Sequence, residues 1–263
     1  MIKYTRGKYP DGWIYADIQD IEDGETITEQ INNYEDLWFI KLLKETIDNL
    51  GVKDINLKIL CMPDQQADAR FKDTQSFNLK AMCEFINNLN FNRVIVYHPH
   101  SLVTSALINN CTVISPKEFI NSVLLNLYRQ GVIAKNLVVV SPDAGSFKWI
   151  QPIIAEHPEI ELVCANKSRV NDTMVNVINK DDFNGKVVLI IDDICVKGST
   201  FINLAQEINK RNAGAQFLAV SHITIRGLRP ELGDLFNRIY TTNSKSNLGK
   251  DYSVGNVTTI YNI

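Results

Sequence analysis

Short apolar runs alternate with segments of helical periodicity along most of the chain. Apolar runs of strand length occur at 56–61, 93–97, 112–115, 137–141, 160–165, 186–191 and 217–222. Apolar residues at helical intervals occur at 37–50, 77–89, 102–108, 117–130, 147–157 and 201–212. Continuous Val/Ile/Leu runs indicate strands buried on both faces, and their alternation with helices predicts an α/β fold with parallel sheets and helices on either side.

The pattern divides the chain into two α/β halves. Residues 1–35 are polar and turn-rich, so we expect short strands and loops there. The strand–helix alternation then runs through both halves, and we predict domains at 1–140 and 141–263. No Gly/Ser-rich linker separates them, which favours close packing of the two halves.

Composition excludes several classes of protein. The 263 residues are 45% hydrophobic and 22% charged, with a net charge of −3 from 27 basic and 30 acidic residues. That balance argues against a nucleic-acid partner, which calls for a basic excess. Apolar runs are too short for a membrane span or a signal peptide. Five scattered cysteines without a Cys-x-x-Cys spacing favour reduced thiols in a cytoplasm over zinc or disulfides.

The most specific motif follows the apolar run that ends at Ile191. Two acids come first, and a Lys-Gly-Ser-Thr segment then precedes a helix; its members are Asp192, Asp193, Lys197, Gly198, Ser199 and Thr200. Open amides at a helix start favour a phosphate, and paired carboxylates suit ribose hydroxyls, directly or through Mg²⁺. Ordinary helix caps use the same residue types. The combination at this spacing favours a ribose-phosphate site.

This loop resembles the phosphoribosyl-diphosphate loop of type I phosphoribosyltransferases and ribose-phosphate diphosphokinases. Three further segments are similar to the diphosphokinases: Ser141-Pro-Asp-Ala-Gly145, Asn166-Lys-Ser-Arg169 and Tyr97-His-Pro-His-Ser101. The second of them resembles the catalytic flexible loop of that family, so a flexible loop is expected there. Their order and spacing match over residues 56–225. The resemblance implies two phosphoribosyltransferase-like parallel-sheet α/β domains in tandem. The first would serve the nucleotide and the second would carry the ribose-phosphate loop.

The resemblance also implies a reaction. The family transfers the diphosphoryl group of ATP to the anomeric hydroxyl of ribose 5-phosphate in a Mg²⁺-dependent step. By their place in the matched segments, Lys167 and Arg169 would stabilise developing charge, and His100 with Asp143 would hold the metal. The family further implies a homo-oligomer, at least a dimer. Cys195 lies inside the loop, and we interpret it as a packing residue.

Several positions depart from the family pattern, and they cluster on substrate contacts. Val196 stands where the family has an aspartate that contacts the ribose. The nucleotide segments are altered as well, with Trp13 in place of a glutamate that meets adenine. The nucleotide-binding residues that we expect from these segments are Tyr9, Trp13, Gln66, Asp68 and Arg70.

These departures leave four functions open. The chain could make phosphoribosyl diphosphate, or it could diphosphorylate a larger ribose 5-phosphoryl compound such as ADP-ribose. It could also be a non-catalytic partner, or a type I phosphoribosyltransferase. The retained motifs favour an active diphosphokinase, and the complete first α/β half argues against a phosphoribosyltransferase.

Overall fold

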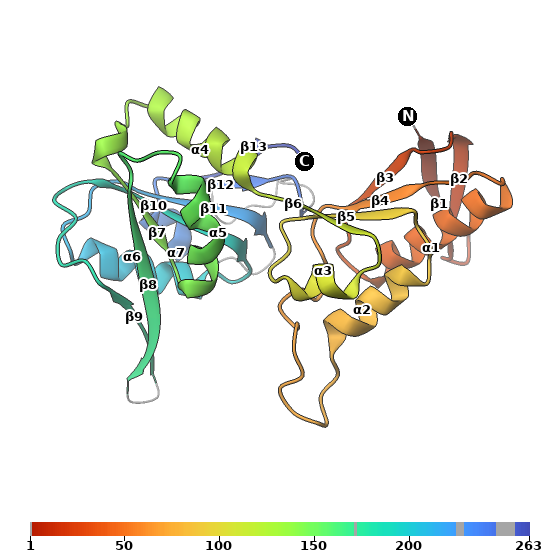
Figure 1. Ribbon diagram of the computed structural model, residues 1–263, viewed down its shortest axis with the longest axis horizontal. Helices are drawn as coiled ribbons and strands as arrows, with labels where there is room; N and C mark the ends of the chain where they lie inside the picture. The colour runs from red at the N-terminus through yellow and green to blue at the C-terminus, as the bar shows by residue number, and fades with distance from the viewer. Residues whose placement is uncertain (1, 171–172, 225–228, 246–255) are drawn as a thin grey trace. The chain divides into compact units, whose positions relative to one another are not determined.

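The protein consists of two compact units, shown in the computed structural model of Figure 1. The structure describes residues 2–170, 173–224, 229–245 and 256–263, with the backbone alone at 167–170 and 173–177. The units divide between Ser115 and Pro116, well before the boundary at residue 140 that the sequence suggested. Helix α4 (Lys117–Arg129) belongs to the second unit because Phe119 and Val123 pack with Leu137 and Val139 of the following strand.

The first unit combines an antiparallel hairpin with a parallel four-stranded sheet of order β3-β4-β5-β6. The hairpin strands are β1 (Lys3–Lys8) and β2 (Ile14–Asp20). The sheet strands are β3 (Thr26–Glu29), β4 (Asn56–Ile59), β5 (Arg93–Tyr97) and β6 (Cys111–Ile114). The helices are α1 (Tyr34–Asn49), α2 (Asn78–Asn87) and α3 (Val103–Leu107).

One apolar cluster forms the core of the first unit. Leu43 and Ile47 of α1 and Leu79 of α2 pack there with Leu57 and Ile59 of β4. Helix α1 begins three residues before the predicted start because a capping box fixes its N-terminus. Asn33 accepts from the amide of Asp36, and the Asp36 carboxylate accepts in return from the amide of Asn33, so two otherwise unpaired amide groups are satisfied.

The second unit is built on a seven-stranded sheet of order β13-β12-β11-β10-β7-β8-β9. All neighbours are parallel except β8 and β9. Its strands are β7 (Leu137–Ser141), β8 (Glu161–Val170), β9 (Thr173–Ile178), β10 (Val187–Cys195), β11 (Gln216–Ile223), β12 (Arg238–Thr242) and β13 (Val257–Tyr261). The remaining elements are the 3-10 turn η1 (Ala134–Asn136) and the helices α5 (Ala144–Ile154), α6 (Ser199–Asn209) and α7 (Glu231–Leu235).

Successive side chains of the central strand β10 pack into two different cores, one on each face of the sheet. In β10, Leu189 and Ile191 pack with α4 and α5, whereas Val188 and Ile190 pack with α6 and α7. The period of two follows from strand geometry. It confirms for this unit the three-layer arrangement expected from the continuous apolar runs.

The segment after the first part of β8 differs from the sequence-based expectation. Asn166–Arg169 was expected to be a flexible loop, but β8 continues through it and pairs with β9 in an antiparallel hairpin (Figure 1). No element was predicted from the sequence at β9, α7, β12 or β13. No helix among the described residues is both long and apolar enough to cross a bilayer.

Candidate functional site

The loop between β10 and α6 presents a helix N-terminus at the carboxyl end of the sheet. Gly198 occupies the N-cap of α6 with φ +85°, a left-handed conformation. Glycine adopts it without the steric cost that a side chain brings. Because glycine has no side chain, it does not cap the first amide groups of α6. Such amide groups at a helix start favour an anion.

The space around Gly198 also requires a glycine. A Cβ atom built there would lie 2.3 Å from Cδ1 of Leu232, a buried residue of α7. Leu232 was not predicted from the sequence, since no local motif connects it to the loop. Close contact between the loop and α7 therefore fixes the position at which α6 begins.

The two aspartates of the motif lie at the end of β10. Asp192 is half-buried, Asp193 is buried, and Oδ1 of Asp192 accepts from the amide of Asp193 at 3.0 Å. Burial and then the charge of Asp193 raise the pKa of the Asp192 carboxyl well above its usual range. The Asp193 amide opposes this shift, and Asp143 adds to it. Two carboxyl groups thus share the end of β10 where water is scarce, and a bound cation or hydroxyl donors would favour their charged forms.

Asp143 follows β7, the neighbour of β10, and caps helix α5. Its Oδ1 accepts from the amides of Gly145 and Ser146, both at 3.0 Å. This cap explains why α5 begins at Ala144, three residues before the predicted start. Asp143 therefore has a structural role, and it also lies close enough to raise the pKa of Asp192.

The carboxyl groups at this end of the sheet are of the type that binds Mg²⁺. Carboxylate oxygens are the donors that Mg²⁺ prefers, and it often takes only one or two of them together with substrate phosphates. Within the described ranges, no three His, Cys, Asp or Glu side chains form a metal site by themselves. His100 belongs to the first unit and Asp143 to the second, so their joint metal role stays a prediction.

The remaining residues of the loop differ in exposure. Lys197 and Ser199 are exposed, Thr200 is half-buried, and Val196 is 37% exposed. Cys195 is buried in the core beside α6, and burial raises the pKa of its thiol to about 12. The thiol is therefore protonated at neutral pH, and its role in packing is confirmed.

The predicted catalytic residues lie on the hairpin of β8 and β9. The backbone pairs Lys167 with Asn176 and Arg169 with Met174. The side chains of these four residues lie outside the described part of the structure, so the catalytic assignment of Lys167 and Arg169 stays a prediction.

The predicted nucleotide residues lie on two segments of the first unit. Tyr9 and Trp13 close the turn of the β1–β2 hairpin, where the Tyr9 amide donates to the carbonyl of Trp13 at 2.7 Å. Both aromatic side chains are exposed, with Trp13 at 70%. The other three, Gln66, Asp68 and Arg70, lie between β4 and α2, with Asp68 half-buried and its two companions exposed.

Gln65 connects the segment after β4 to the segment after β5. It is 3% exposed; its Oε1 accepts from the amide of His100 at 3.0 Å, and its Nε2 donates to Sγ of Cys61 at 3.6 Å. This long-range contact brings the predicted nucleotide segment beside His100. Gln65 was not predicted as a site residue, because no spacing rule in the sequence points to it.

Comparisons with known proteins agree with the fold of the chain. A family model described as "Phosphoribosyl transferase domain" matches residues 118–228. The ribose-phosphate pyrophosphokinase of Methanobrevibacter smithii is 24% identical, covering 91% of this chain and 84% of its own. That of Saccharolobus solfataricus is 25% identical, covering 86% and 78%. The phosphoribosylpyrophosphate synthetase of Mycobacterium smegmatis shares the fold, with a TM-score of 0.81, 15% identity and coverage of 98% of this chain and 85% of that one.

Proposed function

We propose that this chain, a divergent member of the ribose-phosphate pyrophosphokinase family, transfers the diphosphoryl group of ATP to the anomeric hydroxyl of ribose 5-phosphate. The observation that carries the proposal is the carboxyl end of β10. There, an acidic, partly desolvated pair precedes a helix start that a left-handed glycine leaves uncapped. A ribose phosphate needs two kinds of contact: carboxyl oxygens that accept hydrogen bonds from its hydroxyls, and amide groups that donate hydrogen bonds to its phosphate.

Each part of this site has a distinct task. The amides at Gly198–Thr200 bind the 5-phosphate, and Asp192 with Asp193 accepts hydrogen bonds from the ribose hydroxyls. This fixes the anomeric oxygen for attack on the β-phosphorus of ATP. The new bond joins that oxygen to the β-phosphorus, the bond from this phosphorus to the bridging oxygen of the α-phosphate breaks, AMP leaves, and the hydroxyl proton is released to solvent. Lys167 and Arg169 stabilise the charge that develops on the transferred oxygens.

Bound Mg²⁺ would neutralise phosphate charge, with His100 and Asp143 as its proposed ligands and the β10 carboxylates nearby. Tyr9, Trp13, Gln66, Asp68 and Arg70 form the proposed contacts to ATP. As in the family that the sequence resembles, we expect a cytoplasmic homo-oligomer of at least two chains.

A second acceptor deserves a direct test because of Val196. This exposed side chain stands at the loop where an aspartate would contact the ribose. An apolar residue there weakens the case for ribose 5-phosphate and leaves room for a larger compound with a free anomeric hydroxyl, such as ADP-ribose.

Mass spectrometry of the purified protein with ATP and Mg²⁺ tests both acceptors, with ribose 5-phosphate and ADP-ribose in separate reactions. AMP together with a diphosphorylated product in one reaction supports the proposed chemistry and names the acceptor. Asp193→Asn should abolish that product, whereas Asp181→Asn, an exposed carboxylate outside the site, should not. Intact ATP in both reactions would favour a non-catalytic partner or a phosphoribosyltransferase instead.

A further inference from the structure

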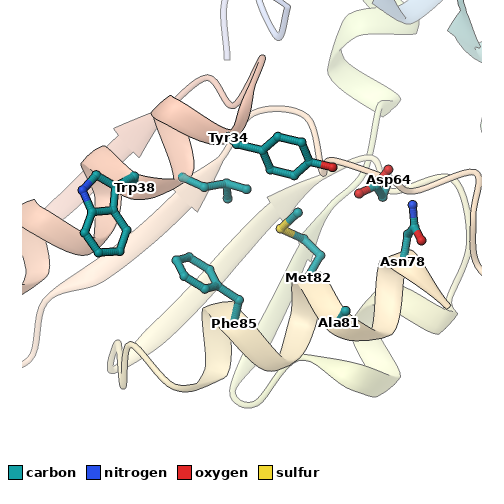
Figure 2. Close-up of a pocket in the computed structure, with 8 residues that line it drawn as sticks. Tyr34, Trp38, Asp64, Asn78, Ala81, Met82 and Phe85 are labelled. Atoms are coloured by element: carbon teal, nitrogen blue, oxygen red, sulfur yellow. The ribbon is translucent and has the colours of Figure 1, made fainter. Parts of the chain in front are cut away.

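A cavity of about 370 Å³ lies in the first unit, between the N-terminal half of α1 and helix α2 (Figure 2). None of its lining residues belongs to the loop of the second unit or to the nucleotide residues predicted above, but Tyr34 and Trp38 also line a neighbouring pocket that includes Trp13. Its volume is at the lower end of the range typical of small-molecule pockets. The eight residues that line it are Tyr34, Leu37, Trp38, Asp64, Asn78, Ala81, Met82 and Phe85.

The two long walls of the cavity are aromatic and apolar. Tyr34 and Trp38 line the α1 side, and Met82 and Phe85 line the α2 side (Figure 2). Tyr34 is 78% exposed and Trp38 48% exposed, although large aromatic side chains usually dominate cores and interfaces. Aromatic walls on opposite sides suit a flat ring that stacks between them.

Polar groups lie together at one end of the cavity. Asp64 and Asn78 meet there, and the hydroxyl of Tyr34 points toward Asp64 (Figure 2). Oδ1 of Asn78 accepts a hydrogen bond from Ser76, which leaves the amide nitrogen of Asn78 as the donor. The end of the cavity therefore combines a carboxylate acceptor with an amide donor.

The local backbone places Asp64 at this end. Asp64 has φ +52°, in the left-handed region, and its carbonyl accepts from the amide of Ala67 at 2.8 Å. Aspartate tolerates this conformation better than most residues. The turn after β4 thus directs an acid toward the start of α2.

We propose that this cavity binds the base of a purine nucleoside. A purine is flat, it carries adjacent donor and acceptor groups on its edge, and its fused rings fill the aromatic gap better than a single pyrimidine ring does. The lining contains one carboxylate, and no lysine or arginine among the described residues. Phosphate groups would meet only negative charge there, so the pocket should favour adenosine over ATP.

Isothermal titration of the full-length protein with adenosine, in the absence of ATP and metal, tests the site without requiring turnover. Trp38→Ala should weaken adenosine binding at least about fivefold, in line with the loss of one stacking partner. Trp38→Phe should retain most of the binding, because it keeps an aromatic ring. Asp64→Ala should weaken binding about tenfold through loss of the charged acceptor.

Matched controls separate the cavity from general surface effects. Phe71→Ala and Asp73→Asn alter an exposed aromatic residue and an exposed acid that do not line the cavity. Both variants should bind adenosine as the unchanged protein does. Uridine should bind at least fivefold more weakly than adenosine.

Three outcomes would overturn the proposal. If adenosine binds the Trp38→Ala variant as tightly as it binds the unchanged protein, the adenosine site is not this cavity. ATP that binds more tightly than adenosine, with the same dependence on Trp38, would make this the nucleotide site of the reaction. The third outcome combines two results: adenosine does not bind, and sedimentation shows that the Trp38→Ala substitution dissociates an oligomer. The aromatic walls would then be a contact between copies of the chain.

Discussion

Replacing Gly198 by alanine should damage both the fold and the ribose-phosphate site. The left-handed φ of +85° costs alanine about 1–2 kcal/mol. The new Cβ would also lie 2.3 Å from Leu232 Cδ1, and forced overpacking costs about 1–3 kcal/mol. We therefore expect Gly198→Ala to lower the free energy of unfolding of the second unit by about 2–5 kcal/mol.

Gly185 provides the matched control. It has a similar left-handed φ of +69°, but an added Cβ would have no atom within 4 Å. Gly185→Ala should therefore cost only the conformational part, about 1–2 kcal/mol. The difference between the two variants isolates the contact with Leu232.

Urea denaturation, monitored by the fluorescence of Trp149, measures the free energy of unfolding of these variants. Trp13 and Trp38 lie in the first unit and Trp149 in α5 of the second, so a Trp13→Phe/Trp38→Phe background restricts the signal to the second unit. The double variant Gly198→Ala/Leu232→Ala should be less destabilised than the sum of its parts by about 1–3 kcal/mol. Equal costs for Gly198→Ala and Gly185→Ala would refute the steric part of the reasoning.

The same variant should also weaken ligand binding. A shift at the start of α6 misplaces the amides that would bind the 5-phosphate, and loss of one hydrogen bond to a charged group corresponds to about tenfold or more in affinity. Titration with ribose 5-phosphate measures this loss. Unchanged affinity in a folded Gly198→Ala protein would place the phosphate elsewhere.

Three further predictions concern other parts of the site. A raised folded-state pKa means that Asp192 binds its proton more readily in the folded than in the unfolded protein. Its contribution to stability is therefore lost as pH rises from about 4 through that raised pKa. Asp192→Asn should raise the urea midpoint at pH 7 and flatten this pH dependence while turnover falls; a pH profile that overlays that of the unchanged protein would contradict the shift. Lys167→Ala should reduce turnover at least about a hundredfold in the mass-spectrometric assay, and unchanged turnover would remove Lys167 from the mechanism. Gln65→Leu removes the acceptor of the His100 amide, so thermal denaturation should show a loss of about 1–3 kcal/mol, whereas the exposed Gln66→Leu should leave stability unchanged.

Much of the fold could be predicted from local patterns. The bounds of β5 and β7 match the predicted runs residue for residue. In β7 all five side chains are buried, and burial on both faces gives an uninterrupted apolar signal. Helix starts were less accurate. Asn33 and Asp143 cap α1 and α5 ahead of the first periodic apolar residue, so hydrophobic spacing alone places both starts too late.

The polar hairpin of β8 and β9 illustrates a different limit. Asn166–Arg169 has no apolar alternation, and its strand conformation comes from pairing with Met174–Val177 of β9. Propensity within a short window does not contain that pairing. The sequence therefore suggested a loop.

The candidate site divides in the same way. The acid pair and Gly198 were identified because they lie within a few residues of one another. Leu232 and Gln65 were missed because they act across long sequence separations, through a packing contact and a buried hydrogen bond. Contacts of this kind become visible only once the sheet is assembled.

The two-core alternation of β10 has a consequence for how such a chain can change over evolution. A single-residue insertion before Asp192 would exchange Leu189 and Ile191 with Val188 and Ile190 between the two cores, because the side-chain period is two. The positions of the two aspartates along the chain are thus constrained by the packing of the strand that precedes them. Exposed positions such as Val196 carry no such constraint. New acceptor specificity should therefore arise at the loop tip, and laboratory selection for altered substrates would do best to begin there.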